Sequence, residues 1–191
     1  DEVTTRNVLL VEHDTPLTGE IDWAGIVASL DGGKVDMVRL HHETAIGEHH
    51  VHMMLDQAPR TDLGPVPLVR TSQWSQRPHV ATLGWYRNVL DHHFAPEARV
   101  MIEDVMHGVC AVAWHEYGIA GWSRFRLAMY VPEGDNIQRS LHLDTRRRIV
   151  GDRLFKFADA FVSFCGVRFL PQRFQSAVGR FVFIERQVQA R

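Results

Sequence analysis

The first third of the chain carries apolar residues at helical spacing. Ile21, Ala24 and Ala28 lie three or four positions apart, which predicts a helix over about Ile21–Leu30. The "DGG" at Asp31–Gly33 ends this helix, because glycine tolerates the left-handed backbone of a helix C-terminus.

Shorter patterns predict the segments around this helix. Asn7–His13 reads as a short strand or the lead into a helix, Lys34–His42 as a second helix, and Thr44–Leu55 as extended chain. A loop punctuated by prolines is expected over Asp56–Pro78. Helical spacing then returns and predicts a helix over Val80–Asp91.

From Arg99 to Phe157 the pattern changes to apolar residues at every second position. Four or five segments alternate in this way between turn-like separators, which predicts an antiparallel meander followed by a short closing helix. The expected fold class is therefore α+β: a cone-shaped, curved antiparallel sheet with the N-terminal helices packed on its concave face. Such a cone encloses one apolar pocket with a few polar groups at its base.

Composition adds a domain count and excludes some partners. The 191 residues predict a single domain over 1–191, with a core of about 14–170 and a C-terminal extension at 171–191. A formal net charge of −2 gives no basic excess, so no nucleic-acid partner is expected.

Cysteine usage and hydropathy predict a cytoplasmic location. Cys110 and Cys165 both stand among apolar neighbours, as buried free thiols of a reducing compartment do. The chain has no run of about 18 apolar residues and does not begin like a secretory signal, so no membrane partner is expected. It also does not begin with methionine, so the true N-terminus is not visible.

Three segments resemble, in order, parts of the nuclear-transport-factor-2-like superfamily. They are "SLDGGKVDMVRLHHETAIGEHH", "GWYRNVLDHHFAPEARVMIEDVMHGVCAVAWHEYG" and "RRIVGDRLFKFADAFVSFCGV". The likeness is nearest to the SnoaL-like polyketide cyclases and steroid isomerases. It implies a cystatin-like α+β barrel with one deep pocket, often a homodimer, and a hydrophobic small-molecule substrate.

The resemblance also implies catalytic positions. The carboxylate base of the steroid isomerases corresponds here to His49, which could move a proton near neutral pH or simply cap a strand. A second family carboxylate corresponds to Phe157, a departure that puts any mechanism needing a last-strand aspartate in doubt. Arg139 falls near the position of an oxyanion donor, where a guanidinium could stabilise an enolate.

Further pocket residues are expected from the predicted strand "VCAVAWHEYG". Trp114 would face the pocket as an aromatic wall, and Glu116 on the same face would be a carboxylate with a raised pKa or a strand-end residue in water. Trp23, Tyr86 and His52 are expected to line the pocket or its rim.

The histidines of "HHETAIGEHHVHMM" also raise the question of a metal site. On a strand, His50 and His52 would share a face and could chelate, with His41, His42 or Glu48 as a third ligand. His49 and His50 would then point to opposite faces, and we therefore predict no metal and no cofactor.

Three functions remain open at this point. The first is a cofactor-independent isomerase, cyclase or dehydratase that acts on a hydrophobic oxygenated molecule in secondary metabolism. The second is a non-catalytic binding module or oligomer subunit of the same fold, and the third is a histidine-ligated metalloprotein.

Overall fold

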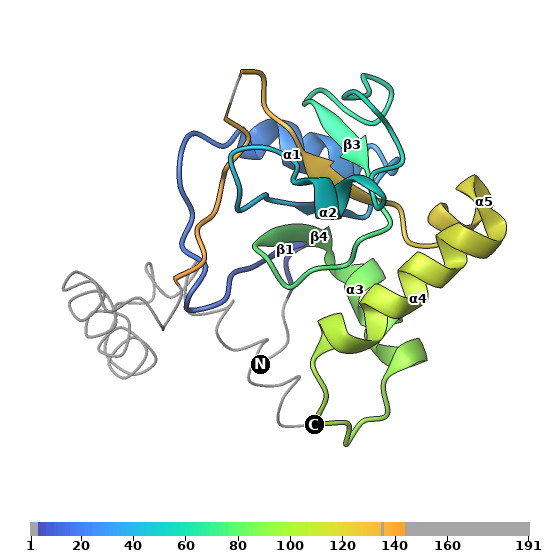
Figure 1. The fold of residues 1–191 in the computed structure, drawn as a ribbon. Coiled ribbons are helices and arrows are strands. Elements are labelled where there is room, and N and C mark those ends of the chain that lie inside the picture. Colours follow the sequence, from blue (N-terminus) through green and yellow to red (C-terminus); the bar gives the residue numbers. More distant parts are fainter. Residues whose placement is uncertain (1–3, 135, 144–191) are drawn as a thin grey trace, which may run out of the picture.

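Five strands form one mixed sheet, shown in Figure 1. The computed structural model describes residues 4–134 and 136–143. Its elements, in chain order, are β1 (Asn7–Leu10), α1 (Trp23–Asp31), β2 (Met37–Arg39), α2 (Glu48–Val51), β3 (Leu68–Arg70), β4 (His79–Thr82), α3 (Leu83–His93), α4 (Ile102–Tyr117), α5 (Ile119–Trp122) and β5 (Leu127–Tyr130). The strand order β1-β4-β2-β5-β3 places β2 in the middle.

The central strand β2 lies where the sequence predicts a helix. It pairs with β4 antiparallel and with β5 parallel, and all six residues from Val35 to Leu40 are buried. A strand covered on both faces has no polar face, so its sequence lacks a clean period of two. The helix prediction over Lys34–His42 is wrong for this reason.

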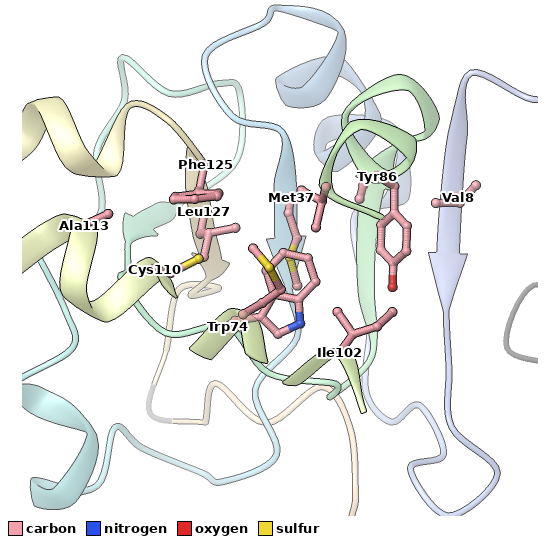
Figure 2. Packing of buried hydrophobic residues seen from close by; sticks show 12 residues of the cluster. Val8, Met37, Trp74, Tyr86, Ile102, Cys110, Ala113, Phe125 and Leu127 are labelled. Atoms are coloured by element: carbon pink, nitrogen blue, oxygen red, sulfur yellow. The ribbon is translucent and has the colours of Figure 1, made fainter. Parts of the chain in front are cut away.

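Alternation along the strands separates two hydrophobic cores. Met37 and Leu127 belong to one core, which α3 and α4 complete with residues such as Tyr86 and Met106. Figure 2 shows Trp74 in the midst of this core. The residues that follow them in the strands, such as Val38, belong to a second core with Ile26 and Leu30 of α1. The sheet therefore separates α1 from α3 and α4.

Helix α4 replaces two of the predicted strands. Its buried residues are Ile102, Met106, Cys110 and Ala113, whose spacing of four, four and three is helical. The alternation of valine and alanine in "VCAVAW" imitated a strand because small apolar residues lie on more than one side of the helix. The strand over "VCAVAWHEYG" is therefore a wrong prediction.

Several other predictions are confirmed in outline. Helix α1 lies within the predicted Ile21–Leu30 to within a residue, and β1 begins at Asn7 as the strand alternative proposed. Helix α3 covers most of the predicted helix, although His79–Thr82 forms β4 instead. Strand β5 falls in one of the alternating segments, and β3 interrupts the predicted long loop.

The α+β class is confirmed, but the described residues show an open sheet rather than a cone. Strands β1 and β3 stand at its two ends and do not pair with each other. The predicted last strand with Phe157, the closing helix and the extension at 171–191 lie outside the described residues. Among the residues that are described, no helix has the length and hydropathy needed to cross a bilayer.

A segment after β5 holds the chain that leaves β2. The backbone N–H groups of Arg139 and Ser140 both donate to the carbonyl of His41, at 2.8 and 3.0 Å. The side-chain amide of Gln138 donates to the carbonyl of His42 at 2.7 Å. His41 and His42 therefore extend β2 beyond its last residue, held by hydrogen bonds from the segment after β5.

Candidate functional site

Four histidines and one glutamate gather where the chain leaves β2. His41, His42 and Glu43 follow the strand directly, and His49 and His50 lie on the short helix α2. We call these five residues the His–Glu cluster. A chain reversal between residues 43 and 48 brings its two halves together.

Glycine at the start of α2 allows this close approach. Gly47 is the N-cap of α2. A Cβ placed on it would lie 2.7 Å from the His49 ring and 3.1 Å from Oε2 of Glu43. A side chain here would therefore push both groups away.

The Glu43 carboxylate lies at the centre of the cluster. Its Oε2 is 3.8 Å from Nε2 of His41 and 3.9 Å from Nδ1 of His50. Its Oε1 is 3.7 Å from Nε2 of His42 and 3.9 Å from Nε2 of His49. Each carboxylate oxygen therefore faces two imidazoles.

These separations are longer than hydrogen bonds, and several ring nitrogens lack a partner. His41 Nε2 lies 3.1 Å from the carbonyl of Ala45, to which it can donate a proton. Nδ1 of His41, His42 and His50 is buried without a hydrogen-bond partner among the described residues. Buried polar atoms are normally paired, and of these three only Nδ1 of His50 faces the Glu43 carboxylate, so this atom favours an additional occupant between them.

Burial keeps the inner imidazoles neutral. Desolvation, followed by the charge of Arg39, lowers the pKa of His41 to about 4. Desolvation and the charge of Arg77 lower the pKa of His42 to about 4 as well. The pKa of His50 is also lowered, chiefly by burial and then by His49. A neutral imidazole is the form that binds a metal ion.

Three of these side chains satisfy the geometry of a metal site. One ligand atom from each of His41, Glu43 and His50 lies within 4.8 Å of the other two. Around a tetrahedral zinc ion, bonds of about 2.1 Å place ligand atoms roughly 3.4 Å apart. To reach this geometry, the two measured separations must contract by a few tenths of an ångström, and the nitrogens of His41 and His50, which lie within 4.8 Å of each other, must also approach. The Nε2 proton of His41 would be displaced from the Ala45 carbonyl.

The sequence argument against a metal fails at its premise. It treated the second pair of histidines as part of a strand, but they lie on α2. The ring centroids of His49 and His50 are 4.0 Å apart, and both rings approach Glu43. His52, the predicted partner of His50, is exposed at the C-cap of α2, and Glu48 is exposed as well.

The other predicted catalytic residues do not join the cluster. Glu116 is exposed near the end of α4. Arg139 touches the cluster only through its backbone, because its guanidinium donates to the carbonyls of Asn136 and Gln138. Its side chain lines an open hollow of about 620 Å³ with Glu20, Asp22 and Tyr130.

The aromatic residues that were predicted to line one pocket lie in different parts of the structure. Trp23 is 38% exposed at the start of α1, and Trp114 packs against the α1-side core. Tyr86 is buried on α3 with its ring stacked on His79, so it is a core residue. Phe157 lies outside the described residues.

Sequence reasoning missed one residue within the cluster and one beside it. Glu43 carries a carboxylate directly after two histidines, a signal that was present in "HHET". Arg39 was missed because β2 was read as a helix, on which it would have faced solvent. In the sheet it is only 2% exposed.

No protein family, curated protein or solved structure matches this chain.

Proposed function

We propose that the protein binds a divalent transition-metal ion through His41, Glu43 and His50. The observation that carries this proposal is the convergence of the three ligand atoms within 4.8 Å. Two imidazoles and one carboxylate form a donor set typical of catalytic zinc sites, which keep a further position open.

The exposure of the cluster favours such an open position. The His41 side chain is fully buried, whereas Glu43 is 36% exposed and His49 is 67% exposed. Solvent or substrate therefore reaches the ion from the side of Glu43 and His49. A bound ion of this type polarises a substrate oxygen and lowers the pKa of bound water to about 7.

The remaining histidines surround the second carboxylate oxygen. His42 and His49 face Oε1 of Glu43, so they orient the carboxylate while Oε2 faces the ion. His49 is also exposed enough to exchange a proton with a substrate. This division of roles supports a metal-dependent enzyme that activates water, such as a hydrolase or hydratase.

Metal analysis of the purified protein tests the proposal. We expect about one equivalent of zinc after loading and dialysis, and at least a hundredfold weaker binding in His50→Ala and Glu43→Gln. His52→Ala is the matched control, because His52 lies on the same segment but points into solvent. Wild-type protein that binds no zinc, or a His50→Ala variant that binds it normally, would refute the metal site.

A second candidate keeps the predicted cofactor-independent acid–base enzyme for a hydrophobic oxygenated substrate. It is supported by Nε2 of His49 lying 3.9 Å from the Glu43 carboxylate, since such a pair can move protons. Turnover that survives chelation and is abolished in His49→Ala would favour this candidate. Ligand binding without turnover would instead favour the non-catalytic binding module.

A further inference from the structure

A buried arginine beside the His–Glu cluster has no carboxylate partner among the described residues. Arg39 is 2% exposed, and its Nε has no hydrogen-bond partner within residues 4–134 and 136–143. Its Nη2 lies 3.2 Å from the sulfur of Met129, which is a weak acceptor. Burial without a counter-ion is unfavourable for a guanidinium.

The sheet fixes the surroundings of this guanidinium. Arg39 is in register with His79 of β4 and with Met129 of β5, so these three side chains form a row on one face. Arg39 and His41 are two residues apart along the extended chain, which places them on the same face. Arg39, His79 and Met129 therefore lie on the same face of the sheet as His41, the buried histidine of the cluster.

Other polar groups in this region are also unpaired. His79 donates through Nδ1 to the carbonyl of Arg77 at 2.8 Å, which leaves its buried Nε2 without a partner among the described residues. The Trp74 ring lies 6.2 Å from the His79 ring, and its indole N–H is buried and unpaired in the same part of the structure. Arg39, His79 and Trp74 thus each carry a buried polar nitrogen without a partner among the described residues.

The nearest acidic side chains do not neutralise Arg39. Glu103 and Glu43 act on it electrostatically, but neither forms an ion pair with it. Oε2 of Glu103 instead accepts a hydrogen bond from the backbone N–H of Gln76 at 3.2 Å. Burial is the main cause that lowers the pKa of His41, His42 and His50, and the charge of Arg39 adds to it in each case.

We infer that Arg39 anchors an oxyanion subsite, so that the ligand of the His–Glu cluster carries a carboxylate or phosphate group. As a statement about substrate class, this rests on the proposed metal site. A divalent ion beside Arg39 would leave the centre with an excess of positive charge that a single Glu43 cannot balance. An anionic group that enters past Glu43 and His42, both partly exposed, supplies the missing charge and fills the guanidinium fork.

The test measures anion binding on the metal-free chain of residues 1–191, separately from zinc binding. Inorganic phosphate and acetate are titrated separately by calorimetry after treatment with a chelator. We expect at least one of them to bind, and the two arms distinguish a phosphate ligand from a carboxylate ligand. Arg39→Met should weaken that binding at least about tenfold, the loss expected for one charge-assisted hydrogen bond.

Matched variants separate the guanidinium from its packing. Met129→Leu removes the sulfur acceptor and should retain anion binding, whereas Arg6→Met changes an arginine that is 71% exposed and should have no effect. If Arg39→Met does not fold, Arg39→Lys keeps the charge without the planar fork and should bind the anion more weakly than wild type.

The inference is overturned if wild-type protein binds neither anion, or if Arg39→Met or a folded Arg39→Lys binds as tightly as wild type. It is also overturned if Met129→Leu loses binding as fully as Arg39→Met, since packing would then explain both. Anion binding without zinc binding would refute the proposed metal site alone. Zinc binding that persists in Arg39→Met, with anion binding lost, is the result we expect.

Discussion

At the scale of single residues, buried neutral histidines give the protein a sensitivity to acid. His79 is fully buried, and desolvation lowers its pKa to about 4. In the unfolded chain its imidazole takes up a proton below about pH 6.5, whereas in the folded protein it does so only near pH 4. The unfolded state therefore binds more protons in this window, and the free energy of unfolding decreases as the pH falls from about 6.5 to 4.

We expect His79→Phe to remove part of this acid sensitivity. One fully buried imidazole accounts for a loss on the order of 3 kcal/mol across the window, and phenylalanine keeps a ring against Tyr86. Urea unfolding of metal-free protein at several pH values measures the slope. His115→Ala changes an exposed histidine and should leave it unaltered. An unchanged slope in His79→Phe would contradict the expected role of burial.

A second residue-scale prediction concerns the ion pair at the start of the parallel strands. Arg126 donates to Asp36 through Nε at 2.6 Å and Nη2 at 2.8 Å, and the Asp36 side chain is only 8% exposed. Arg126→Met leaves a buried carboxylate unpaired, so we expect a loss of roughly 2 kcal/mol, discounted for the partial exposure of Arg126. The surface pair Arg6–Asp31 is the comparison, and Arg6→Met should cost less than about 0.5 kcal/mol. Equal losses in denaturant unfolding would show that burial of Asp36 does not matter.

At the scale of elements, the junction of α4 and α5 depends on one glycine. A Cβ on Gly121 would lie 1.7 Å from the carbonyl oxygen of Ala113, and backbone cannot yield as a side chain can. Gly121→Ala should therefore separate the two helices and lower the free energy of unfolding by about 2 kcal/mol or more. A Cβ on Gly108, within α4, would meet nothing within 4 Å, so Gly108→Ala should stabilise by up to about 1 kcal/mol. Thermal unfolding of both variants tests this, because the midpoint temperature should fall in Gly121→Ala and rise in Gly108→Ala.

The elements also show what the sequence could predict. Helix α1 has one buried face and is followed by glycines, so its periodicity and its C-terminal end were readable. Its N-cap Asp22, whose side chain accepts from the backbone N–H of Gly25, was not recognised. Strand β2 was not readable, because Asp36, directly before it, and Arg39 stand three positions apart, as on one side of a helix, and both are buried. The cluster was visible as a run of histidines, but Glu43 meets His50 only through a reversal whose geometry no local pattern encodes.

At the scale of the whole molecule, helices cover both faces of the sheet, and its strands differ in how many neighbouring strands they pair with. Strand β2 pairs on both sides, whereas β1 and β3 each pair on one side. Amide hydrogen exchange should therefore be slowest in Met37–Arg39 and faster in the end strands, because exchange there needs less of the core to open. Faster exchange in β2 than in β1 would contradict the expectation that β2 is the last strand to open.

The expected homodimer stays a prediction. It was argued from an exposed sheet face, but within the described residues α1 covers one face and α3 and α4 cover the other. On the outer side of β3, the backbone N–H groups of Leu55 and Arg60 already donate to the carbonyls of Arg70 and Leu68, so among the described strands β1 is the end strand left for pairing between copies. Light scattering at high micromolar concentration tests this, and a monomer would refute it.

The hydrogen bonds that hold the chain after β2 affect which metal ion the proposed site would prefer. The carbonyl of His41 is held by two backbone N–H groups, so the first half of the cluster is fixed by the sheet. The second half stands on a four-residue helix without buried residues, which can shift as a unit. A site in which one half is fixed and the other can shift discriminates poorly between ions of different radius. Affinities should then follow the intrinsic order of the divalent ions, with copper above zinc and manganese weakest, and supply rather than fit would decide which ion the protein carries.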